Sequence, residues 1–330
     1  MATYPQNIWK LKQDICEMGR RIWEREYVAA NDGNMSIRIA EDRWLCTPTG
    51  VSKGFLTPAH IGVVDGQGNQ ISGSHARTSE IRMHLAISRK LGPELAGSVI
   101  HTHAPYATAF ALAGKIPPNC IAPEVEVFTG PIEMAPYETP GGWDFAHKVA
   151  EHARPGINTI LLKNHGVVTW GPNVEKAYFQ TEIIDGYCRV LMLASQLGGA
   201  QLLPPPKVKE LLDLKQKFGM PPDARMLDPQ NYPLCSETCG NDLLGRGWRV
   251  DGSSAACPCG GGGPGAGQGC GGKAGGGSAG AGGACACSGT GGGSHGRAEA
   301  VAQAGGSTAG VDEALIQRIT DEVMRALAGR

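Results

Sequence analysis

Apolar and polar residues alternate with two different periods along residues 8–218. From Ile8 to Ile22, apolar side chains recur every three or four positions, which is the period of an amphipathic helix. Similar spacing or composition predicts a set of helices, which cover residues 8–27, 80–90, 104–114, 143–153, 175–197 and 207–218. The longest of them, 175–197, is rich in helix-forming residues.

Between these helices lie short runs that are rich in β-branched residues or alternate apolar with polar positions, and these predict strands. The predicted strands cover residues 35–39, 44–47, 98–103, 125–128, 131–135 and 158–163. Helices and strands alternate, and several strands follow one another as hairpin-like pairs. We therefore expect a single-domain α/β sandwich around a mixed, largely antiparallel sheet.

Two histidines continue one of these strands. His101 and His103 are two positions apart, so on a strand their imidazoles point to the same face and converge. His165 is the candidate for a third ligand; it follows another predicted strand and precedes Gly166, which we expect to permit a tight turn. Three histidines at strand ends suit an open zinc site. The alternative is a surface histidine pair and a hydrogen-bonded turn residue without a metal.

Glu80 begins the predicted helix 80–90, directly after Thr78 and Ser79, which we expect to cap that helix. A glutamate in a first helical turn is stabilised by the helix dipole and needs no other role. The alternative is that Glu80 joins the histidines as an acid or base. His84 follows one turn later and is either an acid/base partner of Glu80 or a histidine packed inside the fold.

The segment 48–54 concentrates small residues and hydroxyl groups, which lets backbone N–H groups approach a phosphate. Lys53 would supply positive charge nearby. An ordinary turn has a similar composition, so the residues alone leave both interpretations open.

Charge and composition exclude several classes of function. The chain has 330 residues and a formal net charge of -1, which gives no bulk attraction to nucleic acid or to an anionic membrane. Its first residues are polar and no apolar run reaches the length of a membrane span, so we expect neither a signal peptide nor a membrane anchor. Eleven cysteines without a secretory signal favour reduced thiols and a cytoplasmic location.

Five motifs occur in the order and approximate spacing of the class II aldolase/adducin family, which the chain resembles over about residues 8–200. They are Gly33-Asn34-Met35-Ser36, Thr47-Pro48-Thr49-Gly50, Thr78-Ser79-Glu80, His101-Thr102-His103 and Asn164-His165-Gly166. The resemblance implies a sugar-phosphate lyase with one divalent metal ion per subunit, Zn²⁺ or another. It also implies a homotetramer with sites at subunit boundaries.

The resemblance further implies roles for individual residues. Glu80 would be the catalytic residue that exchanges the proton on the carbon beside the carbonyl, and it would approach the metal when substrate is absent. The implied metal ligands are His101, His103, His165 and Glu80. The implied phosphate-binding residues are Asn31, Asn34, Thr49, Gly50, Thr78 and Ser79.

The implied reaction is reversible cleavage of a ketose 1-phosphate, either L-fuculose 1-phosphate or L-rhamnulose 1-phosphate, into dihydroxyacetone phosphate and lactaldehyde. A metal would offset, as a Lewis acid, the charge of the enediolate that cleavage leaves. Pentulose-phosphate 4-epimerases of this family commonly carry Asp at the position of Glu80, so the glutamate favours cleavage. A 4-epimerase and a non-catalytic adducin-like scaffold are the alternatives.

The chain departs from the family pattern at one position. A tyrosine that the family contributes from a neighbouring subunit has no counterpart near Cys120, so the proton donor to the leaving aldehyde is unassigned. Glu124 and Tyr137 are candidates for that role, and both are also compatible with a purely structural role.

The end of the family resemblance near residue 200 and two later changes of composition divide the chain into four expected segments. Residues 1–200 form the catalytic domain and 201–250 a C-terminal arm that folds over a neighbouring site; the Gly-, Ala-, Ser- and Cys-rich residues 251–310 bury too little apolar surface to fold and form a disordered linker. Residues 311–330 form an amphipathic helix. This helix resembles the encapsulation peptides that bind shell proteins and place enzymes in the lumen of bacterial microcompartments. Docking on its own domain and a coiled-coil contact are the alternatives.

Overall fold

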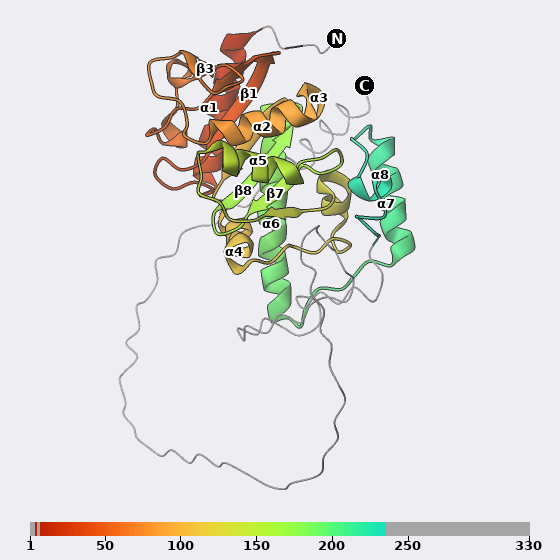
Figure 1. The fold of residues 1–330 in the computed structure, drawn as a ribbon. Helices are drawn as coiled ribbons and strands as arrows, with labels where there is room; N and C mark the ends of the chain where they lie inside the picture. Colours follow the sequence, from red (N-terminus) through yellow and green to blue (C-terminus); the bar gives the residue numbers. More distant parts are fainter. Residues whose placement is uncertain (1–3, 5–6, 235–330) are drawn as a thin grey trace, which may run out of the picture. The chain divides into compact units, whose positions relative to one another are not determined.

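In the computed structural model, which describes residues 4 and 7–234, eight strands form one sheet (Figure 1). The strands are β1 (Asn34–Ala40), β2 (Arg43–Cys46), β3 (Gly62–Val64), β4 (Gln70–Ser72), β5 (Ser98–Thr102), β6 (Glu133–Ala135), β7 (Thr159–Leu162) and β8 (Gly166–Gly171). Their order is β4-β3-β2-β1-β5-β8-β7-β6, and every neighbouring pair is antiparallel except the parallel pair β6 and β7. The predicted α/β fold with a mixed, largely antiparallel sheet is confirmed.

Helices lie on both faces of this sheet. The described helices are α1 (Ile8–Glu24), α2 (Ile81–Leu91), α3 (Pro93–Ala96), α4 (Pro105–Ala113), α5 (Trp143–His152), α6 (Val174–Gln196), α7 (Pro205–Lys217) and α8 (Ala224–Leu227), with short turns η1 (Lys53–Phe55), η2 (Pro58–His60) and η3 (Val125–Thr129). All six predicted helices are present, and their ends differ from the predicted ends by a few residues. Helix α6 is the longest described helix, as predicted.

Successive strand residues belong to two different hydrophobic clusters, because side chains alternate between the faces of a sheet. Ile100 of β5 packs in the cluster that contains the buried residues of α1, α4 and α6. Its neighbour Val99 packs in a second cluster with Met83 and Ile87 of α2 and with buried residues of α5. On β8, Val167 packs in the first of these clusters and its neighbour Val168 in the second. The sheet is therefore the middle layer of a three-layer sandwich, and its central strands are buried on both sides.

One strand prediction was wrong. Residues 125–128 were expected to form a strand, but the segment is the π-helical turn η3. Its β-branched residues suggested a strand, yet Glu126 in the middle of the turn is completely buried and accepts hydrogen bonds from the Cys120 N–H and from the side chains of Asn119 and Arg225. Satisfying a buried carboxylate outweighed the local preference for strand.

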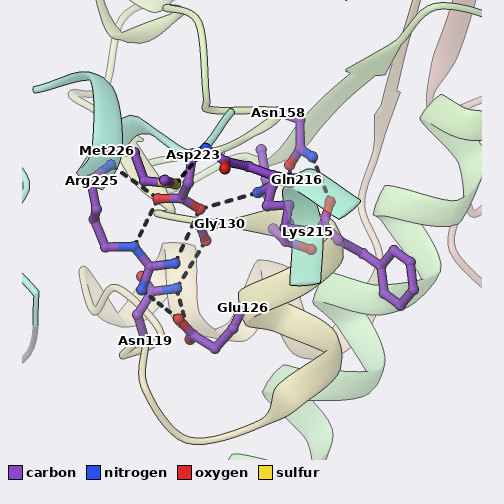
Figure 2. Close-up of polar contacts among 12 residues, drawn as sticks. Asn119, Glu126, Gly130, Asn158, Lys215, Gln216, Asp223, Arg225 and Met226 are labelled. Carbon is purple, nitrogen blue, oxygen red and sulfur yellow. Dashed lines mark hydrogen bonds and ion pairs between the residues drawn. The ribbon is translucent and has the colours of Figure 1, made fainter. Parts of the chain in front are cut away.

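The described part of the C-terminal arm packs on η3 of its own chain through a group of buried charges (Figure 2). Lys215 of α7 donates to Asp223 at 3.1 Å, and Arg225 of α8 donates to Asp223 at 2.8 Å and to Glu126. Each buried charge has an oppositely charged partner, as burial requires. The predicted linker 251–310 and terminal helix 311–330 lie outside the described residues, so those two predictions stay predictions. None of the described helices is long and apolar enough to cross a membrane.

Helix α2 holds a completely buried histidine against β1. His84 bonds to Ser36 and Asn34 of β1, and burial lowers the pKa of its imidazole from 6.5 to about 4. Of the two interpretations given to His84 by the sequence, the structure supports the packed, hydrogen-bonded one.

This buried imidazole should make stability depend on pH. Between about pH 6.5 and pH 4 the unfolded chain binds a proton at residue 84 and the folded chain does not, so stability that is present above pH 6.5 is lost as the pH falls. Across that window, we expect the free energy of unfolding to fall by about 3 kcal/mol more in the wild-type protein than in His84→Gln. Urea denaturation of both metal-free proteins at a series of pH values measures the difference. Equal losses in the two proteins would contradict it.

Candidate metal centre

Three histidines meet at one end of the central strands. His101 is the fourth residue of β5, His103 follows directly after the end of β5, and His165 lies in the turn between β7 and β8. Because β8 pairs antiparallel with both β5 and β7, the end of β5 and this turn lie at the same edge of the sheet. The three ring centroids are 4.6 to 5.1 Å apart, and one nitrogen of each ring lies within 4.8 Å of the others.

Hydrogen bonds determine which ring nitrogens of two of these histidines are free to bind a cation. Nδ1 of His101 lies 3.0 Å from the carbonyl oxygen of Val167. A carbonyl oxygen can only accept a hydrogen bond, so Nδ1 carries the proton and Nε2 has a free lone pair. Nδ1 of His103 lies 3.3 Å from Oδ2 of Asp32, which orients that ring in the same way. Both Nε2 atoms are buried and without a hydrogen-bond partner among the described residues.

Glu80 faces the histidines from the start of α2. Its Oε2 lies 3.4 Å from Nε2 of His101, and its Oε1 lies 3.6 Å from Nε2 of His165. Asn34 donates from Nδ2 to Oε2 at 2.8 Å, whereas Oε1 is buried without a partner. The Nε2 lone pair of His101 and a carboxylate oxygen therefore face each other with no proton between them. Such a donor set suits a divalent cation.

Electrostatics keep this set in the state that a metal requires. Burial lowers the pKa of His101 to about 3 and also lowers that of His165, so both imidazoles are neutral at neutral pH. Burial acts to raise the pKa of Glu80, but His101, His165 and the Asn34 hydrogen bond together hold it below its usual range. Neutral imidazoles beside an ionised carboxylate are the forms that bind zinc.

Gly166 leaves room for the histidine rings. A Cβ atom at this position would lie 2.5 Å from the Thr102 carbonyl oxygen and 2.9 Å from Cδ2 of His103. The residue of this turn with a left-handed backbone is Asn164, at φ 58°. Gly166 was expected to permit the turn, but its role here is to let the rings approach closely, and Asn164 makes the turn.

The segments predicted to bind phosphate lie side by side. A β-bridge joins Pro48 to Arg77, and the Thr78 N–H donates to the Thr47 carbonyl at 3.0 Å. Of the predicted phosphate-binding residues, four are exposed (Asn31, Thr49, Gly50 and Ser79) and two are buried (Asn34 and Thr78). Gly50 has φ 72°, a backbone conformation that favours glycine.

Two expectations about these segments need correction. Lys53 was expected to offer its charge to the phosphate, but its side chain is completely buried and donates to the carbonyl oxygens of Asn31 and Val51 at 2.8 and 2.9 Å. It therefore ties two loops together. Thr78 and Ser79 were expected to cap α2, but the N-cap residue is Glu80. The Thr78 hydroxyl instead accepts a hydrogen bond from the Glu80 N–H at 3.4 Å.

Sequence reasoning missed the residues that orient the ligands. Asp32 was given no role from the sequence, and Ser36 was named only as the last residue of the motif that begins at Gly33. The spacing of Asp32 from His103 carries no signal, because the two meet only through the fold.

Glu124 is exposed and Tyr137 is 55% exposed, and neither has a described contact with the histidines.

Comparisons with known proteins agree with the fold and the motifs. An L-fuculose phosphate aldolase of Methanococcus maripaludis is 35% identical over 185 residues, which cover 56% of this chain and 97% of that protein. A 3-oxo-tetronate 4-phosphate decarboxylase of Haemophilus influenzae is 33% identical over 178 residues, which cover 53% of this chain and 83% of that protein.

A solved structure and a family model extend the match. The crystal structure of YgbL from Klebsiella pneumoniae superposes with a TM-score of 0.56 and 31% identity, over 63% of this chain and all of that one. The model of the class II aldolase and adducin N-terminal domain matches residues 13–192. This match covers more than half of the chain and includes all five motifs, and the chain therefore belongs to the class II aldolase and adducin N-terminal domain family.

Proposed function

We propose that the chain is a metal-dependent lyase that breaks a carbon–carbon bond near the ketone of a phosphorylated sugar. One observation carries this proposal: lone-pair nitrogens of His101 and His103 converge with His165 and an ionised Glu80, and Nε2 of both histidines and Oε1 of Glu80 have no described hydrogen-bond partner. An adducin-like scaffold has no need of such a donor set, which argues against the scaffold alternative.

His101, His103 and His165 would hold the metal, which we propose is Zn²⁺. A bound divalent ion supplies Lewis-acid stabilisation of the negative charge that develops on substrate oxygens. His101 is sealed from solvent, whereas the side chains of His103 and His165 are 30% and 17% exposed. Substrate would therefore approach from the side of His103 and His165.

Glu80 would move the proton. Its lowered pKa keeps it ionised, and its Oε1 has no hydrogen-bond partner, so this oxygen is available to a proton on the substrate carbon beside the carbonyl. A glutamate also supports cleavage over epimerisation, for which aspartate is the common residue in relatives of this family. A 4-epimerase would release no triose phosphate.

The substrate phosphate would lie against the exposed polar groups of Asn31, Thr49, Gly50 and Ser79, with Thr78 behind them. These are neutral donors, which surround a phosphate without binding product too tightly. A ketose 1-phosphate places its phosphate one carbon from the ketone. The proposed substrates are L-fuculose 1-phosphate and L-rhamnulose 1-phosphate, with dihydroxyacetone phosphate and lactaldehyde as products, and the name of the archaeal relative supports the first of them.

A decarboxylase is the second candidate, and two observations favour it. Relatives at 33% and 30% identity are named 3-oxo-tetronate 4-phosphate decarboxylases. In addition, the described residues place no second acid–base group opposite Glu80 to take the hydroxyl proton that a leaving aldehyde loses, whereas a carboxylate that leaves as carbon dioxide has no proton to lose. Both reactions break a bond near a ketone and need the same metal and the same carboxylate.

The proposal also covers the oligomeric state of the protein and its location in the cell. We propose a homotetramer because the resemblance places family sites at subunit boundaries. The four-residue spacing of apolar side chains from Val311 to Leu327, after a Gly-rich segment, supports recruitment to a microcompartment shell protein and a place in the lumen.

Removing one histidine should abolish tight metal binding. We expect His101→Ala to weaken Zn²⁺ binding by more than about 100-fold, since changes outside the ligand set already cost about 10- to 100-fold. Isothermal titration of the metal-free protein measures the affinity, with His75→Ala, an exposed histidine outside the cluster, as the matched control. Equal affinity in His101→Ala and wild type would refute the metal centre.

Turnover should depend on both the metal and Glu80. We expect triose phosphate release from L-fuculose 1-phosphate, L-rhamnulose 1-phosphate or 3-oxo-tetronate 4-phosphate to stop on chelation. It should fall roughly 100- to 10,000-fold in Glu80→Gln but not in Glu94→Gln, which changes an exposed glutamate of α3. Carbon dioxide release identifies the decarboxylase. Metal-loaded protein that releases triose phosphate from none of the three would count against both candidates.

A further inference from the structure

Behind Glu80 lies a line of three buried hydrogen bonds that no described part of the metal centre explains. Oγ of Ser36 lies 2.9 Å from Nδ1 of His84, Nε2 of His84 lies 2.6 Å from Oδ1 of Asn34, and Nδ2 of Asn34 donates to Oε2 of Glu80 at 2.8 Å. Asn34 and Ser36 are two positions apart on β1 and so share a face. Glu80 and His84 are one turn apart at α2.

The chemistry of these groups fixes the direction of every bond. The Glu80 carboxylate only accepts, so the Asn34 amide must present its nitrogen to it and its oxygen to His84. That oxygen also only accepts, so Nε2 of His84 carries the proton. Nδ1 then has a free lone pair and accepts a hydrogen bond from the Ser36 hydroxyl. The carboxylate thus sets the orientation of the Asn34 amide, the amide oxygen sets the tautomer of His84, and Ser36 donates to the remaining ring nitrogen, so His84 and Ser36 hold the amide in this orientation.

Burial makes this arrangement unique. Ser36, His84, Asn34 and Glu80 are 1%, 0%, 4% and 8% exposed, so no bulk water substitutes for a lost partner. If the Asn34 amide turned over, its oxygen would face the carboxylate and its NH₂ group would face the N–H of His84. Both contacts would be repulsive, and each would leave a buried polar group unsatisfied.

We propose that His84 and Ser36 are positioning residues for Glu80, acting through the Asn34 amide. The proposal rests on the proposed function, in which Glu80 lies beside the metal and moves the substrate proton. Asn34 holds Oε2 close to His101 and leaves Oε1 unpaired, so one oxygen is fixed and the other is free for chemistry.

Asn34 thereby gains a second proposed role. The resemblance implies that Asn34 binds the substrate phosphate, and in this structure its side chain is buried, its oxygen is hydrogen-bonded to His84 and its nitrogen donates to Glu80. The exposed residues Asn31, Thr49, Gly50 and Ser79 would form the rest of the phosphate cradle.

Two substitutions of His84 separate positioning from packing. His84→Gln keeps an N–H that reaches the place of Nε2, so it still donates to the Asn34 oxygen. His84→Met fills a similar volume without a donor. Ser36→Ala, a small change within β1, removes the hydrogen bond to Nδ1 of His84 and serves if His84→Met does not fold.

Steady-state kinetics and a metal spectrum give independent readouts. We expect His84→Met to lower kcat roughly 10- to 100-fold with little change in KM or in inhibition by inorganic phosphate. His84→Gln should keep most of the wild-type kcat, and Ser36→Ala should fall between them. In the Co²⁺-substituted proteins, the visible absorption of His84→Met should shift toward that of Glu80→Gln, whereas His84→Gln should keep the wild-type spectrum.

The results also separate this proposal from the proposed function. If the wild type turns over none of the sugar phosphates, the proposed function fails, and the Co²⁺ spectra still test positioning. Equal effects of His84→Gln and His84→Met on kcat and on the spectrum would overturn the positioning role. So would a rise in KM and weaker phosphate inhibition at unchanged kcat, because that result would assign Asn34 to the phosphate alone.

Discussion

The Nε2 lone pair of His101 and a carboxylate oxygen of Glu80 lie 3.4 Å apart in a buried site, and neither has a proton to give the other. The Nε2 lone pair of His103 is buried beside them, also without a described partner. Bringing these atoms together without a cation is unfavourable. Yet the hydrogen bond that His101 donates to Val167, the contact of His103 with Asp32 and the hydrogen bond that Asn34 donates to Glu80 hold the groups in this arrangement. Much of the surrounding structure follows from this single constraint.

The fold meets the constraint with rigid parts. Strand β5 is buried on both faces and paired on both edges, so His101 has a fixed backbone. The antiparallel turn between β7 and β8 returns His165 to the same edge, and Gly166 leaves space for the rings where any side chain would collide. Helix α2 begins near the histidines, and its N-cap residue Glu80 lies beside His101 and His165. The residues that face solvent are those expected to meet substrate.

Local patterns in the sequence predicted the parts whose geometry is itself local. The H-x-H spacing, the strand before His165 and the helix after Glu80 are short-range signals, and they identified the four groups of the centre. Asp32, Ser36 and the true partners of Asn34 were not predictable, because they depend on contacts between residues as far as 71 positions apart in the sequence, as for Asp32 and His103. Residues 125–128 were misassigned for the same reason: Glu126 pairs with Arg225 across 99 positions. Lys53 was expected to be a surface charge, but its buried side chain donates hydrogen bonds to two loop carbonyl groups.

The central claim is that these four side chains form one metal centre. Anomalous diffraction at the zinc absorption edge, from crystals of the zinc-loaded protein, tests it most directly. We expect one strong peak per chain within coordination distance of His101 Nε2, His103 Nε2 and a ring nitrogen of His165, beside Glu80. A zinc-loaded crystal with its peak elsewhere, and with the three imidazoles joined to one another by water, would contradict it.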